Sequence, residues 1–160
     1  MPASRSNPTV LVVTPEVTYL PEGMGNMSNH LTAKAGGLAD VSAALISALF
    51  DQGADVHVAL PDYREIFAAH TAPVLKSEFR RIRDKMPDER IHLAEDRAFF
   101  YTTTVYSHYG SDNIKIALAF QREIINNIMP RVKPDLIHCN DWMTGLIPAA
   151  AREMGIPCLF

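Results

Sequence analysis

Hydrophobic positions in the first half of the chain follow two periods, one typical of strands and one typical of helices. Residues 9–13 form an unbroken aliphatic run, as in a parallel strand buried on both faces. Residues 37–52 carry apolar side chains at helical spacing, and residues 54–60 then alternate between apolar and polar positions as a second strand. The expected buried stripe of the helix consists of Leu38, Val41, Leu45 and Leu49. Gly53 follows the helix where a left-handed cap is expected. This order predicts a βαβ unit with a right-handed crossover in a parallel sheet.

The second half of the chain repeats this alternation after a stretch whose pattern is weaker. Residues 91–93 and 99–106 have strand-like composition, which predicts short strands or a hairpin. Further elements are expected in the order helix, strand, helix and strand, at residues 111–129, 136–139, 144–154 and 156–160. Ser111 or Asp112 is expected to cap the first of these helices, and Pro130 is expected to end it. The whole pattern predicts an α/β fold with a Rossmann-like parallel sheet flanked by helices.

Composition limits the class of protein. The 160 residues suffice for one α/β domain, which we assign to residues 9–160 after a flexible N-terminus at residues 1–8. A formal net charge of -3 and a charged fraction of 21% give no sign of a nucleic-acid or membrane surface. Residues 1–8 lack the apolar segment of a secretory signal, and Cys139 and Cys158 are too few for a disulfide framework. We therefore expect a cytoplasmic protein that binds neither nucleic acid nor membrane. No metal is expected either, because no pair of ligands has zinc spacing.

A lysine followed by two adjacent glycines stands at the start of the first predicted helix. Gly36 and Gly37 let the backbone approach a ligand closely, and the first N–H groups of the helix are unpaired. Such a helix start attracts anions, and Lys34 adds a mobile positive charge. The pattern is that of a candidate phosphate or carboxylate cradle, although for a bare Lys-x-Gly-Gly motif a tight loop with a solvated lysine is the favoured explanation. Residues 23–28 form an incomplete GxGxxG motif without its third glycine, so we discount them as a dinucleotide site.

Polar residues follow the predicted strands at the end of the sheet where ligands usually bind. They are Glu16, Asp62, Asn140 and Asp141. Ligands of open α/β sheets lie beyond the carboxyl ends of the strands. These residues therefore mark the edge of the sheet at which we expect the functional site.

Two segments resemble a known enzyme family. Residues 35–41, Ala-Gly-Gly-Leu-Ala-Asp-Val, resemble the N-terminal motif of bacterial glycogen synthases and plant starch synthases. Residues 134–142, Pro-Asp-Leu-Ile-His-Cys-Asn-Asp-Trp, are similar to a second segment of that family, and residues 60–63 and 111–113 match further positions in order. The resemblance extends from residue 9 to residue 160. It implies a GT-B glycosyltransferase, of which this chain is the N-terminal, acceptor-side domain without the C-terminal nucleotide-sugar domain.

The resemblance also implies an activity and a set of site residues. The family transfers glucose from ADP-glucose to the non-reducing end of an α-1,4-glucan, with retention of configuration and without metal or other cofactor; the sequence does not decide between ADP-glucose and UDP-glucose. Lys34, Gly36 and Gly37 would approach the diphosphate or the donor glucose. Asp40 and Asp141 would be active-site carboxylates, each able to accept two sugar hydroxyl bonds in a fixed geometry. The substrate-binding set is completed by His138 and Asn140.

Several of these residues also have structural explanations. His138 lies within a predicted core strand and is equally well explained as a core histidine, and Asp141 is equally well placed to cap a helix. Trp142 is expected to pack in the core rather than to face a sugar. The chain departs from the family pattern in having Ala35 for threonine and Asn140 for histidine, in Met143 for a further histidine, and in a longer loop at residues 17–33.

Two other functions remain open on the sequence alone. A non-catalytic, stand-alone glucan-binding or interaction module derived from the synthase would carry the same motifs. A nucleotide-binding dehydrogenase domain would rest only on the βαβ unit and the broken glycine motif. Under the synthase hypothesis, we expect the 160-residue chain alone to be inactive, because the donor-holding domain is missing.

Overall fold

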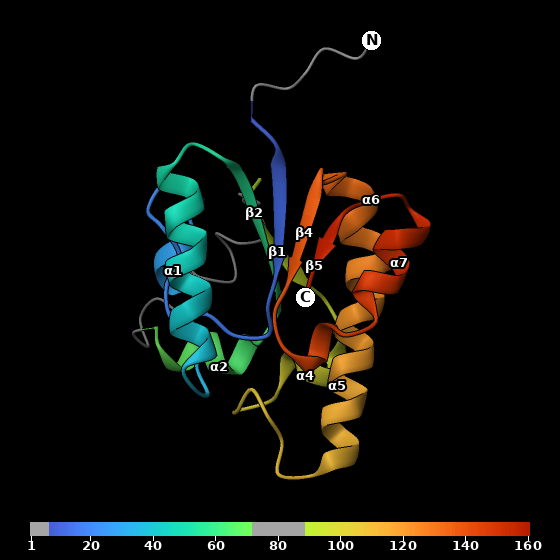
Figure 1. The fold of residues 1–160 in the computed structure, drawn as a ribbon. Coiled ribbons are helices and arrows are strands. Elements are labelled where there is room, and N and C mark those ends of the chain that lie inside the picture. Colours follow the sequence, from blue (N-terminus) through green and yellow to red (C-terminus); the bar gives the residue numbers. More distant parts are fainter. Residues whose placement is uncertain (1–6, 72–88) are drawn as a thin grey trace.

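In the computed structural model, residues 7–71 and 89–160 are described, and they form a three-layer α/β fold (Figure 1). Among these residues, all strands are parallel and belong to one sheet with the order β3-β2-β1-β4-β5. The strands are β1 (Thr9–Val13), β2 (Asp55–Pro61), β3 (Ile91–Ala94), β4 (Leu136–Cys139) and β5 (Cys158–Leu159). The predicted Rossmann-like sheet is confirmed. The expected flexible N-terminus lies almost entirely outside the described residues.

Helices cover both faces of the sheet. Helix α1 (Leu38–Asp51) lies on one side, and α5 (Gly110–Glu123), α6 (Met129–Val132) and α7 (Ile147–Glu153) lie on the other (Figure 1). Two short helices, α2 (Arg64–Ala69) and α4 (Arg97–Phe100), follow the carboxyl ends of β2 and β3. Because both faces are covered, Leu11, Val12 and Val13 of the central strand are completely buried. No helix in the described part of the chain is long and apolar enough to cross a bilayer.

Helix α1 buries a different face from the one that its leucines predict. The buried residues are Ala39, Ser42, Ala43 and Ile46. Val41, which the stripe placed inside, is 62% exposed, and Leu45 is only partly buried. Small side chains let the helix lie close to the sheet, and the Ser42 hydroxyl is 2.9 Å from the hydroxyl of Thr14 at the end of β1. The predicted stripe is therefore wrong, because close approach through small residues outweighs the burial of larger ones.

Residues 91–106, whose pattern is weak, contain one strand and one short helix. Residues 91–94 form β3, so the short strand predicted at residues 91–93 is confirmed. Because β3 pairs in parallel with β2, the alternative of a hairpin is wrong. The strand expected at residues 99–106 is also wrong. Asp96 caps α4 by accepting the N–H of Ala98 at 2.8 Å, and the chain then continues through turns. A capping side chain thus overrides the strand preference of the aromatic residues that follow it.

The long helix neither begins nor ends as the sequence predicts. It begins at Gly110 without a side-chain cap from Ser111 or Asp112; Asn113 instead accepts the N–H of Ser107 at 2.7 Å. It continues past Pro130 because residues Ile124–Ile128 widen into a π-helical turn before α6. The wider turn accommodates a residue that cannot donate a backbone hydrogen bond. The helix ends at Lys133, whose φ is +52°.

Two glycines and one proline stand at helix ends, and Gly53 has the left-handed conformation that the sequence predicts. Gly53 and Gly155 have φ values of +79° and +71°, as left-handed helix ends require. Pro148 lies in the first turn of α7, where its missing N–H costs nothing.

The long loop after β1 is folded onto the sheet. A bridge between Val17 and Ala33 closes its base, and Leu20, Met24, Met27 and Leu31 are buried in the core. Met24 and Met27 therefore fill apolar space between the loop and the sheet.

Candidate functional site

Two of the acidic residues predicted at the carboxyl edge, Glu16 and Asp141, lie where the strand order reverses, whereas Asp62 pairs with Arg64 at 3.0 Å. Chain connections run from β1 to β2 on one side, whereas β4 joins β1 on the other, so the switch point lies between β1 and β4. Glu16 follows β1 and is 2% exposed, and Asp141 follows β4. The two carboxylates therefore stand beside the crevice in which sheets of this type bind ligands.

Tyr106 joins these two carboxylates. Its hydroxyl lies 2.9 Å from Asp141 Oδ2 and 3.1 Å from Glu16 Oε1. Burial, followed by the contacts with Asp141 and Glu16, raises the pKa of Tyr106 well above its ordinary value. The phenol therefore stays neutral and has one proton to donate to one of two acceptors. Sequence reasoning missed Tyr106, because no local pattern indicates that this loop returns to the ends of β1 and β4.

Glu16 also occupies the glycine-rich helix start. Its Oε2 accepts the backbone N–H of Ala35 at 2.7 Å and that of Gly36 at 3.1 Å. The sequence predicts an anion cradle here, and in this structure the anion is a carboxylate of the same chain. No atom lies within 4 Å of a Cβ built on Gly36 or Gly37, so both remain open to solvent.

Lys34 and Asp40 form a separate, exposed pair. Lys34 Nζ is 2.8 Å from Asp40 Oδ2, and Thr18 donates a hydrogen bond to Asp40 Oδ1 at 2.6 Å. The hydrogen bonds from Lys34 and then Thr18 lower the pKa of Asp40 below its ordinary value. The structure therefore pairs Asp40 with Lys34, and it pairs Asp141 with Tyr106.

His138 and Asn140 belong to a hydrogen-bonded chain that leads to α1. His138 Nε2 lies 3.0 Å from Asn140 Oδ1, and Asn140 Nδ2 donates to the Ser42 hydroxyl at 3.1 Å. Because an amide oxygen only accepts, His138 carries its proton on Nε2. This half-buried histidine with a satisfied partner matches the core interpretation, and its role toward a substrate stays a prediction.

Asp141 and Trp142 are oriented by an unusual turn. Asp141 has a φ of +73° and makes no side-chain cap to the 3-10 turn at Trp142–Thr144, so helix capping does not explain it. The strained backbone turns its carboxylate toward Tyr106 instead. Trp142 is 49% exposed, so the expectation that it packs in the core is wrong.

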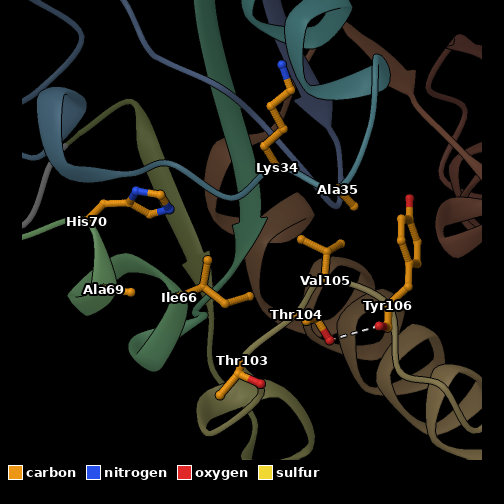
Figure 2. Close-up of a pocket in the computed structure, with 9 residues that line it drawn as sticks. All are labelled: Lys34, Ala35, Ile66, Ala69, His70, Thr103, Thr104, Val105 and Tyr106. Carbon is orange, nitrogen blue, oxygen red and sulfur yellow. Dashed lines mark hydrogen bonds between the residues drawn. The ribbon is translucent and has the colours of Figure 1, made fainter.

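A pocket of about 340 Å³ opens beside Tyr106 (Figure 2). Its lining residues are Lys34, Ala35, Ile66, Ala69, His70, Thr103, Thr104, Val105 and Tyr106. The ammonium end of Lys34 points away from the other lining side chains, while Val105 and Ile66 form an apolar centre (Figure 2). Hydroxyl groups around apolar patches suit a sugar, which has polar edges and apolar faces.

Tyr63 adds an unsatisfied hydroxyl near this cluster. It is completely buried, and within the described residues its Oη has no hydrogen-bond partner. Burial raises the pKa of Tyr63, and nearby Tyr106, Glu16 and Asp141 raise it further. No group of three or more metal-ligating side chains occurs among the described residues.

Comparison with known proteins identifies the family. A family model described as the starch synthase catalytic domain matches residues 9–160. The chain belongs to this family. It is 35% identical over 151 residues to a glycogen synthase of Moorella thermoacetica, covering 87% of this chain and 28% of that protein. Glycogen synthases of Clostridium botulinum and Geobacillus thermodenitrificans are 32% identical over 136 residues and 31% identical over 140 residues. These matches cover 77% and 76% of this chain.

The chain spans just over a quarter of the length of these relatives, 28% or 27%. The match corresponds to their N-terminal part. As a member of the starch synthase catalytic domain family, the chain has a Rossmann-like fold, which is consistent with the N-terminal part of that family.

Proposed function

We propose that this chain supplies the acceptor side of an active site that transfers glucose to the non-reducing end of an α-1,4-glucan with retention of configuration. The donor is ADP-glucose, with UDP-glucose as the alternative. The observation that carries the proposal is the joining of Glu16, Tyr106 and Asp141 at the switch point, beside a pocket lined by hydroxyl and apolar groups. Membership in the starch synthase family supports it.

The acceptor role follows from the hydrogen-bonding capacity of these groups. A sugar hydroxyl needs an acceptor for its proton, and Asp141 has a carboxylate that Tyr106 satisfies at only one oxygen. When a sugar hydroxyl donates to Asp141, the Tyr106 hydroxyl donates its proton to Glu16 instead. Glu16 is held in place by the N–H groups of Ala35 and Gly36, so the site is positioned before the acceptor binds.

The donor role of the glycine motif requires an exchange of partners. Asp40 holds Lys34, and Glu16 holds the first N–H groups of the motif. A diphosphate would bind Lys34 in place of Asp40 and approach Gly37, whose backbone is exposed. Since Lys34 supplies only one positive charge, the remaining stabilisation of the leaving diphosphate falls to the C-terminal domain. We therefore propose that the 160-residue chain alone is inactive.

The compartment is also part of the proposal. Cys139 and Cys158 are both free thiols, as in a protein of a reducing compartment, so we place the reaction in the cytoplasm.

The test measures transfer of labelled glucose from ADP-glucose and from UDP-glucose into glycogen. One sample is the chain alone, and the other is a chimera in which this chain replaces the matching segment of the Moorella thermoacetica glycogen synthase. We expect transfer by the chimera only. Tyr106→Phe in the chimera should lower kcat/KM by about 10–100-fold, since a hydrogen bond to a charged partner contributes roughly 1.5–3 kcal/mol.

Tyr109→Phe is the matched control, because Tyr109 is 72% exposed and its ring makes no contribution to the pocket lining. Transfer by the chain alone would overturn the proposal that its site is incomplete. A Tyr106→Phe chimera with full activity would overturn the acceptor role of the carboxylate pair. Glucan binding by the chain, measured by calorimetry, together with an inactive chimera would favour the stand-alone binding module.

A further inference from the structure

The two cysteines lie together at the edge of the sheet. Cys139 ends β4 and Cys158 begins β5, and their Sγ atoms are 3.7 Å apart. The register pairs Cys158 with Ile137, two residues before Cys139, so both thiols point to the same face of the sheet. Strands β4 and β5 lie side by side in Figure 1. Sequence reasoning treated them only as a pair too small for a disulfide framework.

We propose that Cys139 and Cys158 form a reversible intramolecular disulfide that responds to the thiol–disulfide balance around the protein. Closing the bond shortens the Sγ–Sγ separation from 3.7 Å to about 2 Å. Cys158 can supply this movement, because it is the first residue of β5 and follows the turn at Gly155. Because Cys158 is only partly buried, a reducing thiol can reach the bond and open it again.

The two thiols have different roles in the reaction. Cys158 is partly exposed, whereas Cys139 is 3% exposed. Burial, followed by the proximity of Cys158, raises the pKa of Cys139, which disfavours its thiolate as the attacking group. Cys158 therefore meets the oxidant first, and Cys139 resolves the mixed disulfide.

The oxidant in this reaction is a low-molecular-weight disulfide. The Cys158 sulfur attacks one sulfur of the oxidant, whose S–S bond breaks, and the first small thiol leaves with the Cys158 proton. The Cys139 sulfur then attacks the Cys158 sulfur, and the second small thiol leaves with the Cys139 proton. The two cysteines lose two electrons in total, and the oxidant is reduced to two thiols.

The position of the pair connects it to the site. Cys139 directly precedes Asn140 and Asp141, and the Thr144 hydroxyl donates to the backbone oxygens of both residues in the following turn. A displacement of the end of β4 on disulfide formation would therefore shift the turn that directs Asp141 toward Tyr106. We expect oxidation to weaken glucan binding, a consequence that rests on the proposed function.

The test exposes the folded chain to oxidised glutathione and maps the products by mass spectrometry after alkylation. We expect the loss of two hydrogen masses, the loss of both alkylatable thiols and a peptide cross-link between Cys139 and Cys158. Cys139→Ala should stop at a glutathione adduct on Cys158, and Cys158→Ser should remain unmodified. Trp142, the single tryptophan of the chain, reports movement of the turn by its fluorescence.

Three results would overturn the proposal: a stable glutathione adduct in the native chain, a dimer linked through Cys158, or cross-linking that proceeds no faster in the folded chain than in urea. Calorimetry with a maltooligosaccharide separates the two proposals. If the reduced chain does not bind glucan, the proposed function fails while the disulfide result stands. If glucan binding is normal and no cross-link forms, the disulfide proposal alone fails.

Discussion

Acid should destabilise this protein through a pair of histidines between β2 and β3. His57 Nδ1 lies 2.9 Å from His92 Nε2, and Arg131 of α6 places its Nη2 3.2 Å from His92 Nδ1. Because a guanidinium only donates, His92 Nδ1 must accept, so the His92 proton is on Nε2 and points at His57. On its other side, His57 Nε2 faces Asp55 Oδ1 at 3.5 Å, and Arg90 contacts the same carboxylate oxygen at 3.4 Å.

Protonation of His92 would place a second N–H against Arg131. Burial first, then His57 and Arg131, lower the pKa of His92 from 6.5 to about 3. His57 also has a lowered pKa, chiefly because of burial. Above pH 6.5 the folded and unfolded states are both neutral at His92. Between pH 6.5 and about 3 the unfolded chain binds a proton that the folded chain excludes, so stability falls as the pH falls.

The magnitude at pH 5 follows from this pKa difference. That pH lies about 1.5 pH units below the ordinary histidine pKa, and each unit corresponds to about 1.4 kcal/mol, so His92 should remove about 2 kcal/mol of unfolding free energy. For a chain of this size, this lowers Tm by roughly 4–8 °C. Thermal unfolding followed by circular dichroism at pH 7 and pH 5 measures the change.

The variant His92→Gln isolates this contribution. Glutamine keeps a group that can accept from Arg131 and donate to His57, but its amide cannot be protonated. The drop in Tm between pH 7 and pH 5 should therefore be smaller in His92→Gln than in the native chain, by roughly 4–8 °C. His108→Gln is the control, because His108 is exposed and should leave the drop unchanged. Equal pH dependence in the native chain and in His92→Gln would refute the assignment.

Further predictions concern packing and backbone. Ile46→Ala should cost about 2–5 kcal/mol of unfolding free energy because Ile46 is completely buried. Val41→Ser, at a 62% exposed position, should change the unfolding free energy by less than about 0.5 kcal/mol. Urea denaturation measures both, and a larger loss in Val41→Ser than in Ile46→Ala would support the predicted leucine stripe. Gly155→Ala should cost about 1–2 kcal/mol through its positive φ alone, since nothing lies within 4 Å of the added Cβ. Gly110→Ala, whose added Cβ also meets nothing within 4 Å, should cause no such loss in the same assay, and equal losses would contradict the backbone explanation.

Local patterns in the sequence determine much of this protein. The strands, the glycine ends of two helices and the acidic residues of the carboxyl edge follow from periodicity and from residues that adopt special backbone angles. These properties depend on near neighbours along the chain. The family motifs are local in the same sense, and the family match confirms them over residues 9–160.

Only the tertiary structure decides the contacts on which the proposed function depends. Tyr106 meets Glu16 across 90 residues of sequence and Asp141 across 35, and Glu16 occupies the helix start that the sequence offers to an external anion. The burial of α1 through its small residues depends in the same way on how closely it can approach the sheet. The hydrophobic pattern predicts the five strands of the sheet, together with a strand at residues 99–106 that does not form. It does not specify that β4 lies beside β1, because that order depends on long-range packing, and this order brings the two carboxylates together.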